Sequence, residues 1–471
     1  MKPILKSDNF EIEKAFNWAV DKTAQFVVSK TVNGERNRGD GGKWYGPDNR
    51  VIDKPCELWA KPADYMPSFW AGYYDRTAFY LRDFVHQAAG AHLVGLDEEI
   101  YNMYMTFINS ACEKTGGYAL WSFNFDGSVY YMDTPNYNSF VREITGQFEL
   151  CELAYKLFLW TGDERYVTDK RILNFIDYIL GDFILKNDKN KNGIPEGKGS
   201  IWAGSASYNE RGAFTAETGD EIAALYAALK AYSNILRLNG MENESKFQMR
   251  RVQNLKNYYN NKWSFVEKSD KFAFAADNNG NKQYIWKNEN DFLMGGESLV
   301  FVPVKYLTYP GERTNKLLEY IDECEENPDL RQSNIESLTY LPDAFFAYGK
   351  GDLAYKWMKY IFSKKDLPHE RASQGLNGDY PEISFTLIEQ TVCGLGGIVP
   401  TENGICIFPS MPNEIDYLDF KHLPVCGGYI NVKVSKTNAV IYNCTGKSIN
   451  IKCRCKELIA CNKERVKMFF D

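Results

Sequence analysis

The sequence predicts a mainly α-helical protein: an (α/α)6 toroid of twelve helices followed by a small antiparallel β-domain. Three observations predict this fold. Apolar residues recur every three or four positions as far as residue 397, tight and long connections alternate between the predicted helices, and apolar and polar residues alternate from about residue 398. The predicted domains are therefore 1–397, a catalytic helical domain, and 398–471, a small β-domain.

The helical pattern divides the first domain into twelve segments. They lie at about residues 8–29, 77–95, 97–113, 138–162, 163–184, 219–239, 242–262, 297–308, 311–325, 334–349, 351–364 and 383–396. Gly219 and Asp220 open the sixth segment with an acidic first turn, and Asn239 and Gly240 close it. Acids such as Asp220 and Glu221 interact well with a helix dipole, which favours a structural role for both.

The connections between the predicted helices alternate in length. Even-numbered helices are followed by links of a few residues, whereas long links follow the odd-numbered ones, at 30–76, 114–137, 185–218, 263–296, 326–333 and 365–382. Tight turns make antiparallel neighbours, so the long links should gather at one end of the toroid. Long loops inside a compact domain are usually functional, and we expect the site on this rim.

Composition excludes several classes of function. A net charge of −7 argues against nucleic-acid or anionic-membrane partners, and no apolar run approaches the ~18 residues of a membrane span. The first residues lack the apolar core of a signal peptide, and the 11 Cys include no CxxC pair, so we expect reduced thiols in a cytoplasmic protein. The four His are not at metal-ligand spacing, and we expect neither a metal nor a cofactor.

Aromatic residues make up 15% of the chain, and many of the 10 Trp fall in the predicted long loops. Flat aromatic faces are the surfaces on which sugar rings stack. Together these residues predict an aromatic-lined funnel for a carbohydrate.

Three segments carry a family resemblance. "FWAGYYDRTAFYLRDF" (69–84), "SYNERGAFTAETGDEIAALYAAL" (207–229) and "GDYPEISFTLIEQTVCGLGGIVP" (378–400) resemble segments of the six-hairpin glycosidases, among them glucoamylases and α-L-rhamnosidases. The resemblance implies an (α/α)6 barrel that cleaves glycosidic bonds. It places a sugar-binding Arg and Asp in the first segment, the general acid in the second and the general base in the third. The sequence shows no large N-terminal β-sandwich of the disaccharide phosphorylases, which makes phosphorolysis less expected than hydrolysis.

The resemblance leaves the general acid open. The glucoamylase segment has a Glu where this chain has Asn209, so the acid falls on Glu210, with Glu217 and Glu196 as alternatives in the same loop. A general acid needs partial desolvation to keep its proton at neutral pH, and Tyr208 is a neighbour that could provide it. A solvated loop carboxylate is an equally good interpretation of Glu210.

Glu382, at the start of the last predicted helix, is the candidate general base, and Asp379 is the fallback. The helix dipole favours a charged carboxylate at this position, which suits a base and equally a helix cap. An inverting glycosidase holds its two carboxyl groups about 6.5–9.5 Å apart to admit a water.

Candidate substrate-binding residues lie in the same segments and in the long loops. Asp75 and Arg76 could form paired hydrogen bonds to sugar hydroxyls, whereas Arg82 and Asp83 are expected to form an interhelical salt bridge. The other candidates are Trp70, Trp121, Trp202, Tyr208, Arg211 and Trp286.

The sequence therefore predicts an inverting, exo-acting glycoside hydrolase for an oligosaccharide, with an α-linked substrate favoured by the resemblance. A polysaccharide lyase or unsaturated-uronyl hydrolase, with Arg331 or Arg371 binding a sugar carboxylate, is the alternative, as is a non-catalytic carbohydrate-binding protein. The stretch 187–197 has oxygen side chains at calcium-loop positions, but Gly199 replaces the required Glu, and a loop with Asx turns is preferred.

Overall fold

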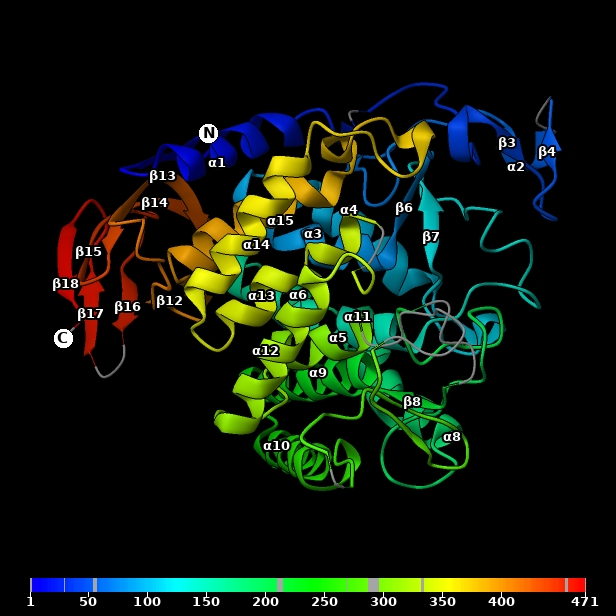
Figure 1. The fold of residues 1–471 in the computed structure, drawn as a ribbon. Helices are drawn as coiled ribbons and strands as arrows, with labels where there is room; N and C mark the ends of the chain where they lie inside the picture. The colour runs from blue at the N-terminus through cyan, green and yellow to red at the C-terminus, as the bar shows by residue number, and fades with distance from the viewer. Residues whose placement is uncertain are drawn as a thin grey trace.

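A computed structural model describes residues 2–28, 30–53, 57–209, 215–267, 269–286, 296–331, 334–453 and 456–470. Each of the twelve predicted helical segments contains helix, and a separate set of strands follows, so a helical domain with a mainly antiparallel sheet domain is confirmed (Figure 1). The long connections lie on the side of β3, β4, β7 and β8, opposite the C-terminal strands.

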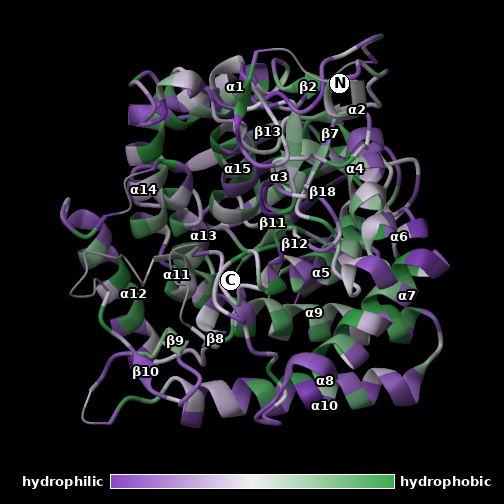
Figure 2. Cartoon of the chain, turned by 90° about the vertical axis from the view of Figure 1, so that its right-hand side faces the viewer, coloured by the Kyte–Doolittle hydropathy of each residue, from purple (hydrophilic) through white to green (hydrophobic). Residues whose placement is uncertain are grey.

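The helices divide into an inner and an outer set when viewed from the end that carries the long connections (Figure 2). The inner helices pack in chain order, α3 on α5, α5 on α9, α9 on α11 and α11 on α13, and α15 packs on α3. They are α3 (Leu81–Leu93), α5 (Ile144–Thr161), α9 (Gly219–Leu238), α11 (Gly296–Val304), α13 (Leu341–Phe346) and α15 (Pro381–Glu389), the last continued by the π-turn η8 (Gln390–Leu395).

The outer helices alternate with the inner ones along the chain. They are α1 (Phe10–Thr23), α4 (Asp97–Ser110), α6 (Arg165–Thr168), α7 (Lys170–Tyr178) with η3 (Ile179–Phe183) and α8 (Ile184–Asn187), α10 (Glu242–Tyr258) with η4 (Tyr259–Trp263), α12 (Glu312–Glu326) and α14 (Gly351–Lys364). A further short helix, α2 (Glu57–Ala60), lies in the first long connection.

Some segments are less helical than their periodicity predicts. Residues 78–80 form strand β6 (Ala78–Tyr80), which pairs with β7 (Ser122–Asn124) before α3 begins. Segment 334–349 forms the 3₁₀ turn η5 (Glu336–Leu338) and then the short α13, because Pro342 starts a new helix and Gly349 ends it with a φ of +70°.

Two glycines set the closest helix contacts. A Cβ on Gly90 of α3 would lie 2.1 Å from the carbonyl oxygen of Phe385 in α15, and a Cβ on Gly219 of α9 would lie 2.3 Å from that of Ser298 in α11. Only glycine permits such an approach of two backbones. The first contact holds α3 closely against α15.

The C-terminal residues form two sheets. One has the order β1-β13-β14-β15-β18 and the other β11-β12-β16-β17, and β12 and β16 are parallel whereas the other neighbours are antiparallel. The strands are β1 (Ile4–Ser7), β11 (Ile398–Thr401), β12 (Gly404–Ile407), β13 (Tyr417–Val425), β14 (Gly428–Ser435), β15 (Asn438–Cys444), β16 (Ile449–Cys453), β17 (Lys456–Ala460) and β18 (Arg465–Phe469). One strand of the first sheet thus comes from residues 4–7, and the division at 397/398 stays a prediction.

Short two- and three-stranded pairings brace the long connections. They involve β2 (Val27–Val28) with β5 (Ser68–Phe69), β3 (Trp44–Tyr45) with β4 (Val51–Ile52), and β8 (Glu217–Thr218) with β9 (Ala275–Ala276) and β10 (Lys282–Gln283). These pairings fix loop segments that would otherwise lack backbone partners.

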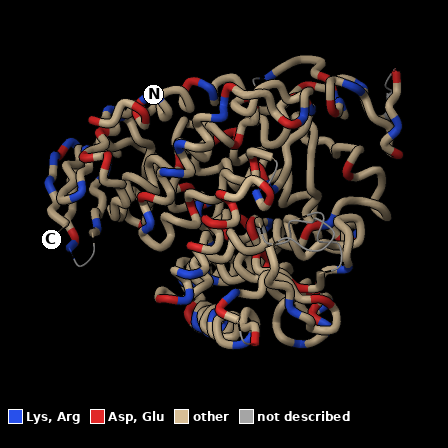
Figure 3. The backbone as a smooth tube through the Cα atoms, viewed as in Figure 1, with Lys and Arg blue, Asp and Glu red and all other residues tan. Residues whose placement is uncertain are grey.

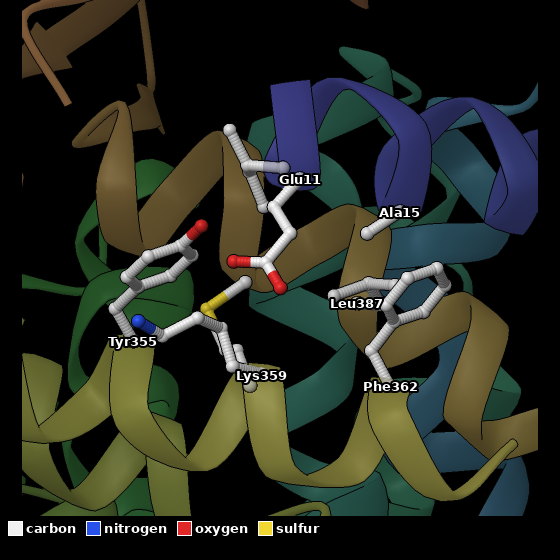
Figure 4. Close-up of a pocket in the computed structure, with 8 residues that line it drawn as sticks. Glu11, Ala15, Tyr355, Lys359, Phe362 and Leu387 are labelled. Carbon is white, nitrogen blue, oxygen red and sulfur yellow. The ribbon is translucent and has the colours of Figure 1, made fainter. Parts of the chain in front are cut away.

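Two large hydrophobic clusters hold the fold, and a third is small. The largest joins the helices to strands and loops between residues 26 and 385, and the second joins α1, α14 and α15 to the C-terminal strands. Figure 4 shows the edge of the second cluster, where Ala15 of α1 faces Phe362 of α14 and Leu387 of α15. The space left there is about 10 Å³, too small for a sugar, so this contact is structural.

Charges are interspersed over both domains (Figure 3), consistent with the composition. None of the helices described is long and apolar enough to cross a membrane.

Candidate active site

The candidate site begins where α3 and α15 meet. Glu382 lies in the first turn of α15, which Pro381 opens at a position where a missing N–H costs nothing. The Glu382 side chain is 4% exposed, and its Oε1 lies 2.8 Å from His86 Nδ1 and accepts a hydrogen bond from Thr339 Oγ1 at 2.5 Å. A carboxylate so held has a fixed direction.

Asp83 lies on the facing helix α3 and is buried. It accepts a hydrogen bond from the Tyr380 hydroxyl, two residues before Glu382. Burial, and then the negative charge of Glu382, raise the pKa of Asp83 to about 7. Two neighbouring carboxyl groups thus stand at adjacent helix starts, and the pKa of one of them, Asp83, is raised.

Asp83→Asn should make stability less dependent on pH. Asp83 has a pKa of about 7 in the folded chain against an ordinary 3.8, so the folded chain binds more protons between these values and loses stability as the pH rises through them. Between pH 4 and pH 8, the wild type should therefore lose ~2–4 kcal/mol more of its free energy of unfolding than the variant does. Urea unfolding at both pH values measures this, and Asp366→Asn, an exposed carboxylate beside Lys365, is the control.

His86 completes the inner part of the site. Its Nδ1 faces Glu382 and its Nε2 lies 3.6 Å from Asp343 Oδ2, while its ring stacks on Tyr340 at 3.6 Å and 5°. Burial opposes a charge here, but Glu382 and Asp343 outweigh it and raise the pKa of His86 to about 10. The imidazole is therefore a cation at neutral pH.

A second carboxylate lies on the rim side of Tyr380. Glu336 accepts hydrogen bonds from Tyr73 Oη at 2.9 Å and pairs with His369 Nε2 at 3.2 Å. Burial alone would raise the pKa of Glu336, but the His369 and Tyr73 contacts hold it below its usual range. Tyr73 and Tyr380 lie 5.6 Å apart and connect this group to Asp83.

Arg76, one of the predicted sugar-binding residues, is held by two side chains. Its Nε donates to Asp40 Oδ1 at 2.7 Å and its Nη1 to Tyr80 Oη at 2.8 Å. Arg371 shares the same Asp40 carboxylate at 3.0 Å and lies 4.0 Å from the Tyr73 ring. The neighbouring Asp75 accepts a hydrogen bond from the backbone N–H of Gly41 at 2.6 Å.

Predicted aromatic residues lie close to Arg76 and to the start of α3. Trp70 Nε1 donates to the Arg76 carbonyl at 2.8 Å, and the Trp121 ring lies 5.2 Å from that of Tyr80. Tyr208 is 1% exposed, its hydroxyl donates to Glu149, and the Arg82 guanidinium lies 4.9 Å from its ring. The structure therefore brings Glu382, Asp75, Arg76, Trp70, Trp121 and Tyr208 to one region.

Glu217, the alternative acid, lies elsewhere. Its carboxylate accepts hydrogen bonds from Asn190 at 2.6 Å, Asn192 at 2.8 Å and Trp263 Nε1 at 2.5 Å. It lines a separate open pocket of about 630 Å³ together with Lys282. These donors give Glu217 a role in holding the 188–196 loop on η4.

The remaining predicted residues are dispersed. Asp379 pairs with Lys22 at 2.6 Å, and Trp286 is 1% exposed with its Nε1 donating to the Leu330 carbonyl. Trp202 is 38% exposed, and its carbonyl accepts from Arg142. Glu210 and Arg211 lie outside the described residues, so both stay predictions.

The 188–196 loop uses its oxygen atoms internally. Asp188 accepts from the N–H groups of Asn192 and Gly193, and Glu196 accepts from those of Lys189 and Asn190. This is the Asx-turn arrangement that the sequence favours. Across the described ranges, no three His, Cys, Asp or Glu side chains are grouped so as to hold a metal.

Sequence reasoning did not assign four residues to the site: Asp83, which it paired with Arg82, and His86, Glu336 and His369. A signal existed for the first two, because Asp83 and His86 are three apart and so share one face at the start of a helix. Glu336 and His369 come from two loops that are distant in the chain, so no local sequence pattern indicates that they pair.

No protein-family model matches the sequence, and no curated protein matches it. Solved structures match its fold. A GH78 family rhamnosidase of Bacillus sp. GL1 matches with a TM-score of 0.61 and 12% sequence identity, and the match covers 95% of this chain and 41% of that chain. An α-L-rhamnosidase from Dictyoglumus thermophilum matches with a TM-score of 0.55 and 13% identity, and the match covers 99% of this chain and 49% of that chain. A human-microbiome protein assigned as a kojibiose phosphorylase matches with a TM-score of 0.54 and 11% identity, and the match covers 99% of this chain and 63% of that chain. The chain thus spans about half the length of the structures it resembles.

Proposed function

We propose that this chain, which has the fold of the six-hairpin glycosidases, is a glycoside hydrolase acting on a carbohydrate. The observation that carries the proposal is the pair of buried carboxyl groups Glu382 and Asp83 at adjacent helix starts, with aromatic and Arg side chains at the entrance. Glycoside hydrolysis needs carboxyl groups that differ in proton affinity in one pocket.

Glu382 is the general base in this proposal. It is held from two sides by Thr339 and His86, so it can take a proton from a water placed against the sugar. The general acid comes from the loop before α9, where Glu210 is the candidate. This division gives inversion of configuration, because a water must fit between acid and base.

Asp83, Arg76 and Asp75 bind the terminal sugar in the same proposal. Asp83 keeps its proton near neutral pH, so it can donate to one sugar hydroxyl as well as accept from another. Trp70 and Trp121 provide apolar faces beside the Arg76 anchor. A pocket bounded in this way suits attack from the non-reducing end, and the fold likeness favours an α-linked substrate.

The proposal includes the architecture and location of the enzyme. We take the inner helices to close into an (α/α)6 toroid that forms the catalytic domain, residues 1–397, with 398–471 as the β-domain. The described cysteines are free thiols, as expected of a protein that works in the cytoplasm.

A panel of p-nitrophenyl glycosides, followed by NMR of the first-formed anomer, tests this function. We expect release of nitrophenol from an α-glycoside, with the inverted anomer appearing first and no change in rate on addition of inorganic phosphate. If the retained anomer appears first, this would contradict the assignment of Glu382 as the general base that activates a water. No turnover across the panel or with natural α-linked oligosaccharides would contradict hydrolysis.

One observation favours a second candidate, a polysaccharide lyase or unsaturated-uronyl hydrolase. Arg371 lies on the Tyr73 ring, and His369 is 6.1 Å from the same ring, so a carboxylate-binding Arg stands beside possible bases. Arg331, the other Arg considered, is instead bound to the Glu325 carbonyl and Tyr360. New ultraviolet absorbance in the product of a uronic-acid polymer would identify a lyase.

A further inference from the structure

A pocket of about 630 Å³ lies between the 188–196 loop and the strands β8, β9 and β10. Its walls come from two of the long connections, 185–218 and 263–296, and in Figures 1 and 2 β8 lies apart from α3 and α15. The volume is that of a pocket for a small organic molecule. The hydrolysis proposed above makes no use of this pocket.

Hydrogen bonds hold the pocket walls in place. Glu196 accepts from the backbone N–H groups of Lys189 and Asn190 at 2.6 and 2.9 Å. Glu217 accepts from the Asn190 amide at 2.6 Å and from Trp263 Nε1 at 2.5 Å. Both carboxylates are buried, and the paired strands β8, β9 and β10 form the facing wall. A ligand would therefore meet a preformed surface, which lowers the entropy lost on binding.

Lys282 of β10 brings unused hydrogen-bond donors to the pocket. Its ammonium lies 4.1 Å from the centroid of the Trp263 ring, and it makes no ion pair or hydrogen bond with a described residue. Burial lowers the pKa of Lys282, although the charge of Glu217 opposes this. A ring face attracts a cation without fixing the direction of its N–H groups, so these donors stay available to acceptor oxygens of a ligand.

The turn between β9 and β10 adds groups that both donate and accept. The side chains of Asn278 and Asn279 line the pocket and make no hydrogen bond within the described part of the chain. Each amide offers two donors and one acceptor. Tyr258, which is half-buried, adds an aromatic surface. Sugars present hydroxyl groups that donate and accept, together with apolar ring faces that pack on aromatic side chains.

The charges of the pocket disfavour an anion. Glu196, Glu217 and Asp277 line it against only Lys189 and Lys282, so the negative groups outnumber the positive ones by one. The carboxylates are not arranged for a metal either, since no such group occurs among the residues that the structure describes. An uncharged, hydroxyl-rich ligand matches this lining best.

We propose that this pocket is a second carbohydrate-binding site, separate from the candidate active site, in which Lys282, Asn278 and Asn279 contact the hydroxyl groups of an uncharged sugar. The proposal rests on the proposed function for its choice of carbohydrate. A second site of this kind would hold the enzyme on a saccharide with several ends and raise the concentration of ends near Glu382.

Acetylation of lysine side chains, followed by mass spectrometry of the full chain, tests the site without any turnover. The probes are maltose, isomaltose, cellobiose and lactose in excess, and we expect the acetylation of Lys282 to slow at least about threefold as the site fills. Lys433 is the control, because it lies 4.0 Å from the Tyr417 ring on the C-terminal sheet, and its rate should not change. An unprotected Lys282 would overturn the site, and so would protection by inorganic phosphate alone.

Variants separate the two sites. Asp75→Ala, which weakens sugar binding at the candidate active site, should leave the protection of Lys282 intact, and loss of protection there would overturn a separate site. In that background Lys282→Met keeps an apolar stem on Trp263 but removes the charged donor, so the Kd measured by calorimetry should rise about 10-fold or more. Lys433→Met should leave the Kd unchanged, and equal Kd values in both Lys variants would also overturn the site.

The outcome is distinct from that of the glycoside panel. Hydrolysis without protection of Lys282 would contradict the second site and leave the proposed function standing. Protection of Lys282 without hydrolysis would support the second site and count against the proposed function.

Discussion

Glu382→Gln is expected to lower kcat/KM by about 10²–10⁴-fold, the usual contribution of a general base. Glutamine keeps the size of the side chain and can still accept a hydrogen bond from Thr339, so the pocket should keep its shape. Substrate should still bind, because the change removes proton acceptance and leaves the entrance intact. Steady-state kinetics on the substrate found with the glycoside panel, with calorimetric binding of the same sugar, measure both effects.

Glu312→Gln is a matched control, because Glu312 also lies in the first turn of a helix but on the exposed outer helix α12. Its kinetics should equal those of the wild type. Equal activity of Glu382→Gln and Glu312→Gln would contradict the role of Glu382. A chain that binds sugar with unchanged affinity in both variants and never turns it over would be a non-catalytic carbohydrate-binding protein.

Lys305→Met is expected to lower the free energy of unfolding by about 3–5 kcal/mol, the cost of leaving buried charges unpaired. The Lys305 ammonium lies 2.5 Å from Glu149 and 2.6 Å from Glu152, and its side chain is 5% exposed. Burial alone would raise the pKa of Glu152, but Lys156 and Lys305 lower it to about 2. The pairing stabilises the fold at pH values above the ordinary pKa of a carboxyl group, and this stabilisation is lost as the pH falls toward 2.

The triple variant Lys305→Met, Glu149→Gln, Glu152→Gln tests whether charge is the cause. Because no buried charge is left unpaired, it should regain most of the lost stability. Urea unfolding at pH 7 compares the three proteins. A triple variant no more stable than Lys305→Met would show that the methylene packing of Lys305 is what matters.

The helices could be predicted because each carries an apolar face that repeats at helical spacing. The start of α9 was also predictable, since Gly219 marks it locally, whereas α15 begins at Pro381, two residues before the predicted segment. The strand β6 and the short α13 were not, because pairing with β7 and the position of Pro342 override the periodicity. Tertiary contacts decided these elements.

The candidate site, like the fold, could be predicted only in part. Glu382 lies at a helix start and Arg76 lies in the loop before β6, and the structure places both in one region. Asp83 and His86 acquire their roles only through the approach of α3 to α15 at Gly90, which pairs residues almost 300 positions apart. Trp286 resembled other loop tryptophans in sequence, yet it packs beneath Tyr320.

Strand β1 has a consequence for how the protein is made. Residues 4–7 pair with 418–421, and Ser7 donates to the Tyr417 carbonyl across 410 positions of sequence. On the ribosome, β1 must wait until β13 has emerged before it finds its partner, and pairings of such separation form late. Until then β13 lacks this neighbour, and an unpaired strand edge invites association with other chains. Strand β1 therefore joins a sheet whose other four strands are all synthesised after the helices.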